Sequence, residues 1–340
     1  MRNPAFDLLW TGLEGLDAGS VSGPEAGAII LFSRNLDPDP KVGPERCHAL
    51  IRGLQARWGQ GTRLAVALDQ EGGAVSRLRV WAGPTPSLRH IWERGGVTAC
   101  ARWGALWGQG LRLLGFNVDF APVADLWDGH PGTGLGDRCA SLDPHKVALA
   151  AGAFLAGLEG TGVRGCLKHF PGLGGTQVDS HLALPELEDA DQRHRNLQPF
   201  LALAHPDRLV MVAHLRTPQT DGLPASLHRA SVAGNPWGIQ GRWIPDDLEM
   251  GGCGEWDWNT RVRLCLESGH QALLVCQTAQ GIDACATALG TMPEALWAPA
   301  REQFLQLRKN LLPHDSAPFD RAGWSVWRSE LRAEAEAFQL

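Results

Sequence analysis

A glycine-rich stretch from Lys168 to His181, KHFPGLGGTQVDSH, holds more ionisable side chains than a turn requires. It is too rich in glycine for a helix or a strand, which favours a mobile loop. Asp179 and His181 stand two residues apart, so the carboxylate can bond the imidazole, fix its tautomer and raise its basicity. Such a pair can deliver and remove a proton near neutral pH. Loop histidines bonded to backbone are the structural alternative, and a zinc site is disfavoured because neither a cysteine nor an HxxxH spacing accompanies them.

Two adjacent carboxylates, Asp246 and Asp247, follow a candidate strand in the segment IPDDLEMGG. Side chains alternate along a strand, so only one of the two can point inward. The other is then expected to cap the next helix or to accept hydrogen bonds from backbone amides. The structural alternative is that both residues are caps.

Two further segments offer groups that suit a polar ligand. In LDQEGGAVSRL, the Asp69 carboxylate can accept hydrogen bonds from hydroxyl groups and the Arg77 guanidinium presents a planar fork of donors. A strand-to-helix turn with a structural ion pair explains that segment equally well. In LGDRCAS, Arg138 lies in a glycine-rich loop, where a surface arginine is the structural alternative.

Short apolar runs recur along the chain, and most are nearly continuous, which is typical of parallel strands buried on both faces. These runs are residues 6–12, 27–33, 63–69, 116–123, 163–170, 208–215, 238–245 and 271–277. Segments with helical periodicity lie between them, at residues 43–58, 99–115 and 143–162, the last with Asp143 as its N-cap.

Eight strands alternating with helices predict an α/β fold of the (β/α)8 TIM barrel type, with a flavodoxin-like or Rossmann sheet as the competing fold. Polar residues cluster where the runs end: Asp69 to Glu71, Asp125, Lys168 and His169, His214, and Asp246 and Asp247. In a barrel these ends meet at one rim, where such enzymes hold their chemistry. We expect residues 1–290 to form a single-domain barrel and residues 291–340 a helical tail packed on it.

The composition is that of an ordinary globular protein, with 44% hydrophobic and 20% charged residues. The formal net charge is -6 and Lys and Arg form no long run, which disfavours a nucleic acid or an anionic membrane as partner. No segment reaches the ~20 apolar residues of a membrane helix. The eight cysteines show no CxxC spacing, so buried reduced thiols are expected. We expect a cytoplasmic monomer without metal or cofactor.

Seven motifs occur in one order along the chain: ILFSRN, DQEGGAVSRL, FAPVADL, GDRCAS, KHFPGLGGTQVDSH, MVAHL and PDDLEM. Together they resemble the bacterial β-N-acetylglucosaminidases of glycoside hydrolase family 3, in its single-domain branch. The resemblance spans roughly residues 27–277. It implies a (β/α)8 barrel that removes terminal N-acetylglucosamine from small saccharides with retention of configuration, in the recycling of peptidoglycan fragments.

The resemblance also assigns roles by position. Asp246 corresponds to the catalytic nucleophile, and Asp179 and His181 to the acid/base pair. The residues that correspond to the sugar-binding set are Asp69, Arg77, Arg138, Lys168 and His169, and His214 lies in a motif that lines the same pocket. No metal ligand is implied.

Three positions depart from the family pattern. Leu173 stands where the family usually has histidine, Ala74 where arginine is common, and Pro245 where serine or threonine precedes the nucleophile. Three alternatives stay open, and the Leu173 and Ala74 departures motivate the second of them. The enzyme could transfer the sugar to phosphate, because a histidine acid/base does not repel the anion. The barrel could bind a saccharide without turnover. A barrel enzyme for phosphorylated metabolites is disfavoured, because no glycine-rich phosphate loop follows the seventh or eighth run.

Overall fold

Each of the eight predicted apolar runs contains a strand. The structure is a computed structural model that describes residues 2–19, 23–59, 62–127, 129, 133–313 and 317–338. The eight strands are β1 (Leu9–Thr11), β2 (Ala28–Ile30), β3 (Ala65–Ala67), β6 (Val118–Asp119), β7 (Arg164–Phe170), β8 (Leu209–Val212), β9 (Arg242–Pro245) and β10 (Leu273–Val275). Their side chains are buried almost throughout, as expected for parallel strands covered on both faces.

The strands form two four-stranded sheets, in the orders β10-β1-β2-β3 and β6-β7-β8-β9, and every pairing in both sheets is parallel. A small antiparallel pair, β4 (Gln70–Gly72) and β5 (Val75–Ser76), extends from the end of β3. The carboxyl ends of parallel strands lie on one side of a sheet, so the polar residues after them can meet there.

Backbone hydrogen bonds join the two sheets at both of their edges. Between the β3 and β6 segments, the amide of Asn117 donates to Val66 at 3.2 Å and the amide of Phe120 donates to Leu68 at 2.8 Å. Between the β9 and β10 segments, the amide of Gln271 donates to Trp243 at 2.8 Å. These three amides at the edges are therefore paired rather than left buried without a partner.

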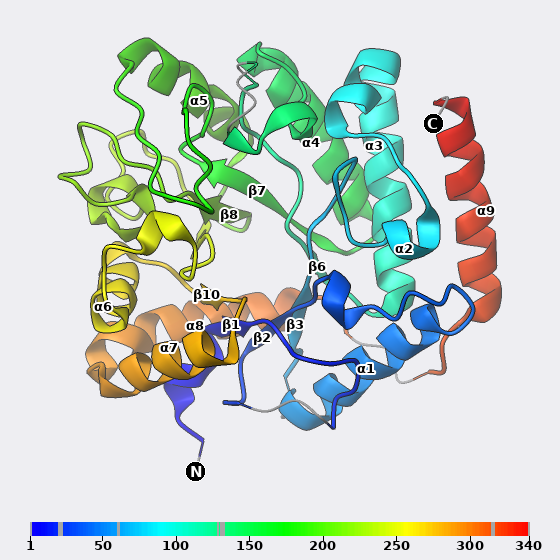
Figure 1. Ribbon diagram of the computed structural model, residues 1–340, viewed down its shortest axis with the longest axis horizontal. Helices are drawn as coiled ribbons and strands as arrows, with labels where there is room; N and C mark the ends of the chain where they lie inside the picture. The colour runs from blue at the N-terminus through cyan, green and yellow to red at the C-terminus, as the bar shows by residue number, and fades with distance from the viewer. Residues whose placement is uncertain are drawn as a thin grey trace.

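Helices follow most of the strands and cover the sheets (Figure 1). They are α1 (Gly43–Trp58), α2 (Arg79–Ala82), α3 (Leu88–Leu114), α4 (Pro144–Gly160), α5 (Ala190–Leu203), α6 (Trp258–Ser268), α7 (Ala279–Thr291), α8 (Glu294–Asn310) and α9 (Arg321–Ala337). The helix predicted at residues 43–58 is confirmed, and so is the cap at residue 143, where the Asp143 carboxylate accepts from the His145 amide at 2.9 Å. The helix predicted at residues 99–115 starts earlier, at Leu88, with a break at Gly96, where φ is 55°.

The alternation of strand and helix is confirmed, but not for every connection. Residues 213–241, between β8 and β9, are all described and contain no α-helix, but the 3-10 turns η5 (Ala225–Leu227) and η6 (Arg229–Ser231) and an isolated β-bridge at Arg216. Three prolines and four glycines in this segment explain the difference, since proline cannot continue a helix and glycine disfavours one. The described residues between β1 and β2 form no α-helix either.

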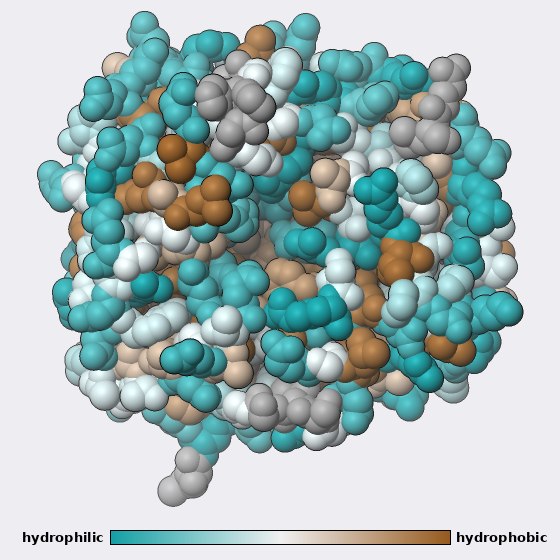
Figure 2. Space-filling view, in the orientation of Figure 1, coloured by the Kyte–Doolittle hydropathy of each residue, from teal (hydrophilic) through white to brown (hydrophobic). Residues whose placement is uncertain are grey.

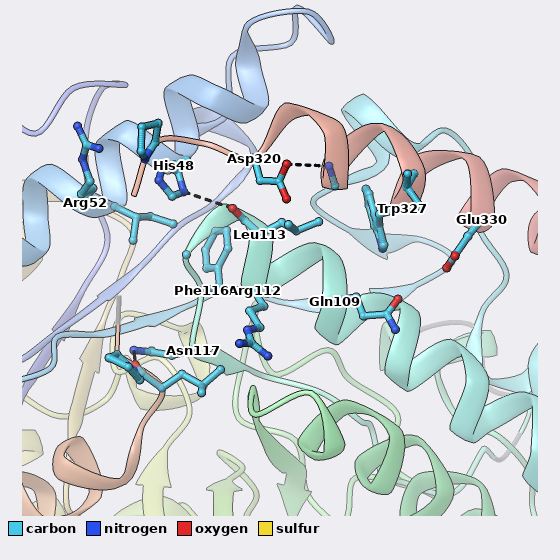
Figure 3. A pocket seen from close by; sticks show the side chains of 17 residues that line it. His48, Arg52, Gln109, Arg112, Leu113, Phe116, Asn117, Asp320, Trp327 and Glu330 are labelled. Carbon is cyan, nitrogen blue, oxygen red and sulfur yellow. Dashed lines mark hydrogen bonds between the residues drawn. The ribbon is translucent and has the colours of Figure 1, made fainter. Parts of the chain in front are cut away.

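The helices α3 and α4 pack side by side, and α9 lies on the outer side of α3 (Figure 1). Glycine permits the close crossing of α3 and α4, because a Cβ atom on Gly104 would lie 2.1 Å from the Phe154 carbonyl oxygen. The indole of Trp327 on α9 donates to the Leu106 carbonyl at 2.7 Å. A cavity between α1, α3 and α9 is lined by His48, Arg112 and Trp327, among others, and holds none of the predicted site residues (Figure 3).

All eight cysteines are buried and free, which confirms the prediction of reduced thiols. Burial raises the pKa of the Cys100 thiol to about 12, so that thiol is protonated at neutral pH. In the part of the chain that the structure describes, no helix is both long enough and apolar enough to cross a membrane.

Candidate active site

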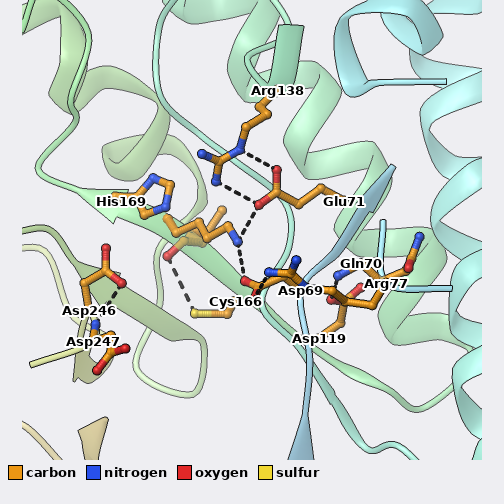
Figure 4. A network of polar contacts seen from close by, with 12 residues as sticks. Asp69, Gln70, Glu71, Arg77, Asp119, Arg138, Cys166, His169, Asp246 and Asp247 are labelled. Atoms are coloured by element: carbon orange, nitrogen blue, oxygen red, sulfur yellow. Dashed lines mark hydrogen bonds and ion pairs between the residues drawn. The ribbon is translucent and has the colours of Figure 1, made fainter. Parts of the chain in front are cut away.

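A buried lysine joins two carboxylates at the carboxyl end of the strands (Figure 4). Lys168 on β7 has only 2% of its side chain exposed, and its Nζ lies 2.8 Å from Asp69 Oδ1 and 2.5 Å from Glu71 Oε1. Burial opposes the charge of Lys168, but the two carboxylates outweigh it and raise the pKa of the ammonium. Lys168 is therefore a cation fixed between two carboxylates.

Two arginines complete this network. Arg138 on η4 (Gly136–Arg138) forms a two-point ion pair with Glu71, with Nε and Nη2 at 2.8 and 2.9 Å from the carboxylate oxygens. Arg77 Nη2 lies 3.3 Å from Asp69 Oδ2. Burial opposes ionisation of Glu71, yet Arg138 and Lys168 hold its pKa well below its usual range. The fork geometry fixes Arg138 in one orientation, as a donor for a polar ligand must be.

His169 is oriented by a carboxylate that the predicted site did not include. Its backbone amide and its Nδ1 lie 3.2 and 2.7 Å from Asp125 Oδ2, and Asp125 Oδ1 accepts from the Leu173 amide at 2.7 Å. The bond to Asp125 favours a proton on Nδ1, which makes Nε2 the free acceptor. Asp125 and Glu71 were visible in the sequence as polar residues after strands, but a position alone does not tell a supporting residue from a contacting one.

The two adjacent carboxylates face opposite ways, as predicted. Asp247 is buried and accepts hydrogen bonds from the amides of Glu249 and Cys276 and from the Gln277 side chain, at 3.1, 3.3 and 2.9 Å. Burial raises the pKa of Asp247 to about 6. Asp246 is partly exposed, and in Figure 4 its carboxylate points to the side on which His169 lies, whereas that of Asp247 points away.

Asp179 and His181 form the predicted pair in the loop after β7. The ring Nδ1 and the amide of His181 lie 2.8 and 2.9 Å from Asp179 Oδ1, and 65% of the His181 side chain is exposed. Burial opposes ionisation of Asp179, but the two hydrogen bonds from His181 and the charge of Arg138 lower its pKa. The ring nitrogen Nε2 is thus left for a reacting group.

The pair lies close to the rest of the site. The second oxygen of Asp179 faces the loop of Arg138, since a Cβ atom on Gly134 would lie 2.8 Å from it. Gly252 lies between His214 and the loop of His181, since a Cβ atom on Gly252 would lie 2.6 Å from His214 Cβ and 3.3 Å from the Ser180 carbonyl oxygen. The centre of the molecular face in Figure 2 is hollowed, as a site for a small ligand requires.

The binding role predicted for His214 does not fit its position. Its side chain is 0% exposed, with Nδ1 2.7 Å from Ser226 Oγ and Nε2 2.9 Å from the Asp247 carbonyl. Because both ring nitrogens are engaged within the protein, the ring supports the backbone next to Asp246 instead of contacting a ligand. Burial lowers its pKa, so it is neutral at pH 7.

The departures from the family pattern have structural consequences. Leu173 is 5% exposed and belongs to an apolar cluster beneath the loop, with Leu135, Leu187 and Leu215 among its members. The cluster ties the loop after β7 to the end of β8 and to the loop of Arg138. Ala74 is exposed, and Pro245 is the last residue of β9, paired with Val212. The described residues contain no group of three or more His, Cys, Asp or Glu side chains that could hold a metal ion.

Comparison with known proteins places this chain among glycoside hydrolases. Residues 16–300 match the model of the glycosyl hydrolase family 3 N terminal domain. A beta-hexosaminidase of Pseudomonas aeruginosa (strain LESB58) is 34% identical over 280 residues, which cover 80% of this chain and 81% of the relative. A beta-hexosaminidase of Methylococcus capsulatus is 32% identical over 285 residues, covering 81% of this chain and 83% of the relative.

Solved structures show the same similarity along nearly the whole chain. NagZ from Neisseria gonorrhoeae is 27% identical with a TM-score of 0.78, covering 99% of this chain and 98% of that one. Its complex with N-trifluoroacetyl-D-glucosamine is 28% identical with a TM-score of 0.78 and covers 98% of both chains. A family 3 glycosyl hydrolase of Mycobacterium smegmatis is 29% identical with a TM-score of 0.78, covering 92% of this chain and 98% of the other.

Proposed function

The chain belongs to glycosyl hydrolase family 3, and we propose that it removes terminal β-linked N-acetylglucosamine from small saccharides with retention of configuration. The observation that carries this proposal is that one carboxylate, Asp246, points to the side on which His169 lies (Figure 4), while an exposed Asp179–His181 pair lies beside the loop of Arg138. The curated relatives that share most of this chain are beta-hexosaminidases, and one structural relative has bound an N-acylated glucosamine analogue.

In this proposal the charged cluster holds the sugar. Asp69 accepts hydrogen bonds from hydroxyl groups, while Arg77, Arg138 and Lys168 donate to them. His169 offers Nε2 as a further partner. Since these side chains are already held by one another, binding costs little ordering of the site.

The reaction then proceeds in two displacements. An oxygen of Asp246 forms a bond to C1 as the bond from C1 to the glycosidic oxygen breaks, and the protonated ring of His181 gives its proton to the departing oxygen. Next, His181 takes a proton from a water whose oxygen attacks C1, and Asp246 leaves as a carboxylate. Most retaining glycosidases use two carboxyl groups about 5.5 Å apart. A histidine has an ordinary pKa already near neutral and adds less negative charge opposite the nucleophile.

The proposal also covers the barrel, the natural substrates, the location in the cell and the oligomeric state. The hydrogen bonds at both sheet edges support a closed (β/α)8 barrel over residues 1–290, with residues 291–340 as a helical tail. We propose fragments of peptidoglycan as the natural substrates and the cytoplasm as the location, which the eight buried free thiols favour. Gel filtration with light scattering tests the expected monomer.

The test is turnover of phenyl N-acetyl-β-D-glucosaminide, with the configuration of the first-formed product read by NMR. Trapping with a 2-fluoro sugar and peptide mapping then identifies the nucleophile. A label on the peptide that contains Asp246 supports the proposal, and a label elsewhere contradicts it. Adding phosphate distinguishes phosphorolysis, in which the sugar phosphate replaces free sugar as product. Binding of N-acetylglucosamine without any turnover would show a saccharide-binding protein instead.

A further inference from the structure

The loop that carries the Asp179–His181 pair rests on the segment that follows Asp246. The amide of Gly251 donates to the His181 carbonyl at 3.1 Å, and the amide of Gly252 donates to the Ser180 carbonyl at 3.0 Å. Both glycines belong to the 3-10 turn η7 (Gly251–Cys253). Two consecutive hydrogen bonds therefore connect the backbone of His181 to the chain segment that starts at Asp246.

The contact is too close for a side chain. A Cβ atom on Gly251 would lie 2.3 Å from the Leu182 carbonyl oxygen and 2.9 Å from the His181 carbonyl oxygen. Both neighbours are backbone atoms, which cannot swing aside as a side chain can. Glycine is necessary here because a Cβ atom has no room, and not because the backbone has a positive φ. An added methyl group would push the loop away from η7 by roughly 1 Å.

Such a displacement would move the acid/base group directly. The His181 ring is largely exposed and is held by Asp179, two residues away on the same loop. If the backbone of the loop moves, the His181 ring therefore moves with it. The distance between the ring and Asp246 thus depends on the position of the loop.

We infer that Gly251 is a positioning residue, which sets the distance between the His181 acid/base and the Asp246 nucleophile through its amide and its lack of a side chain. The inference rests on the proposed function. Leu182 follows His181 with 80% of its surface exposed, so side-chain packing at this position does not replace the backbone contact.

The test is Gly251→Ala, assayed with two substrates that differ in their need for an acid. Phenyl N-acetyl-β-D-glucosaminide has a poor leaving group and requires protonation, whereas the 2,4-dinitrophenyl glycoside does not. A misplacement of about 1 Å can cost roughly 100-fold, so we expect kcat/KM to fall by about that factor for the phenyl substrate only. In a His181→Ala background the same change should have no further effect on the phenyl substrate.

Gly254→Ala is the matched control. It adds the same methyl group to the residue that ends the same turn, where the new Cβ would meet only backbone of Gly251, at 3.2 Å for its carbonyl oxygen. We expect kcat/KM of this variant to stay near that of the wild type for both substrates. An equal loss for both substrates in Gly251→Ala, or no loss for either, would overturn the inference.

Hydrogen exchange separates this inference from the proposed function. In the wild type the amides of Gly251 and Gly252 should exchange slowly, because both are bonded to the loop. In Gly251→Ala, but not in Gly254→Ala, exchange of residues 176–183 should become faster. Rapid exchange of the two glycine amides in the wild type would overturn the inference even if the variant does not fold. A wild type that cleaves neither substrate would refute the proposed function and leave the exchange data to decide the loop contact.

Discussion

The carboxylates of the neighbouring residues Asp246 and Asp247 point in opposite directions (Figure 4). Asp247 is enclosed by three donors, whereas Asp246 Oδ1 accepts only from the amide of Asp247, at 2.9 Å, among the contacts of the described residues. One carboxylate is thus part of the framework, and the other remains available for chemistry.

This difference separates two alanine variants. Asp246→Ala should lower kcat by about four orders of magnitude or more, as loss of a covalent nucleophile does, with little change in Tm. Asp247→Ala should lower the free energy of unfolding by about 1–3 kcal/mol, because it leaves buried donors unpaired. Kinetics and urea denaturation of both variants measure this, and a fully active Asp246→Ala would contradict the assignment.

Glu71 links stability to pH. Its pKa is lower in the folded than in the unfolded protein, so its contribution is complete above the unfolded value of about 4.3 and declines as the pH falls below it. Glu71→Gln leaves Lys168 and Arg138 buried without this partner, and we expect a loss of about 3–5 kcal/mol at pH 7. Urea denaturation from pH 7 to pH 3 measures the free energy of unfolding of the wild type and of Glu71→Gln. The difference between the two values should shrink as the pH falls. A difference in unfolding free energy that is the same at every pH would show that the charge of Glu71 does not contribute to stability.

Leu173 anchors the loop of Asp179 and His181 through apolar contact. Leu173→Ala should cost about 2–4 kcal/mol of unfolding free energy, since it leaves a cavity in the cluster beneath the loop. Leu173→His, which restores the usual residue of the family, should also destabilise, because an imidazole among leucines loses its hydrogen bonds to water. Leu182→Ala on the same loop is the control, with an expected change within about 0.5 kcal/mol. A more stable Leu173→His would show that the pocket accepts a polar ring.

Asp179 orients the ring of His181. Asp179→Asn should lower kcat/KM for the phenyl glycoside on the order of 100-fold, because the amide cannot hold the imidazolium as a carboxylate does. Asp189 provides a matched control, since it also accepts from nearby backbone amides, at the start of α5. Asp189→Asn should leave kcat/KM unchanged. Equal losses in the two variants would indicate a general effect on the loop rather than on the ring.

The sequence by itself indicated the eight strands, the family and the hydrogen bond between Asp179 and His181. Continuous apolar runs marked all eight strands, because strands buried on both faces need no polar alternation. The order of motifs pointed to the family, and the spacing of Asp179 and His181 pointed to their hydrogen bond, since both residues lie within a single turn of the chain.

Only the tertiary structure decided which polar residues are buried in the framework and which are exposed. His214, Asp125 and Glu71 all follow or lie beside strands, yet burial and partners from distant segments give each a different role. The helix missing after β8 and the contact of Gly251 with the His181 loop were likewise settled by the fold. The physical reason is that the local sequence pattern indicates only which face of a helix or strand is apolar. The hydrogen-bond and ion-pair partners of a polar side chain come from segments tens of residues away, and only the fold brings those segments together.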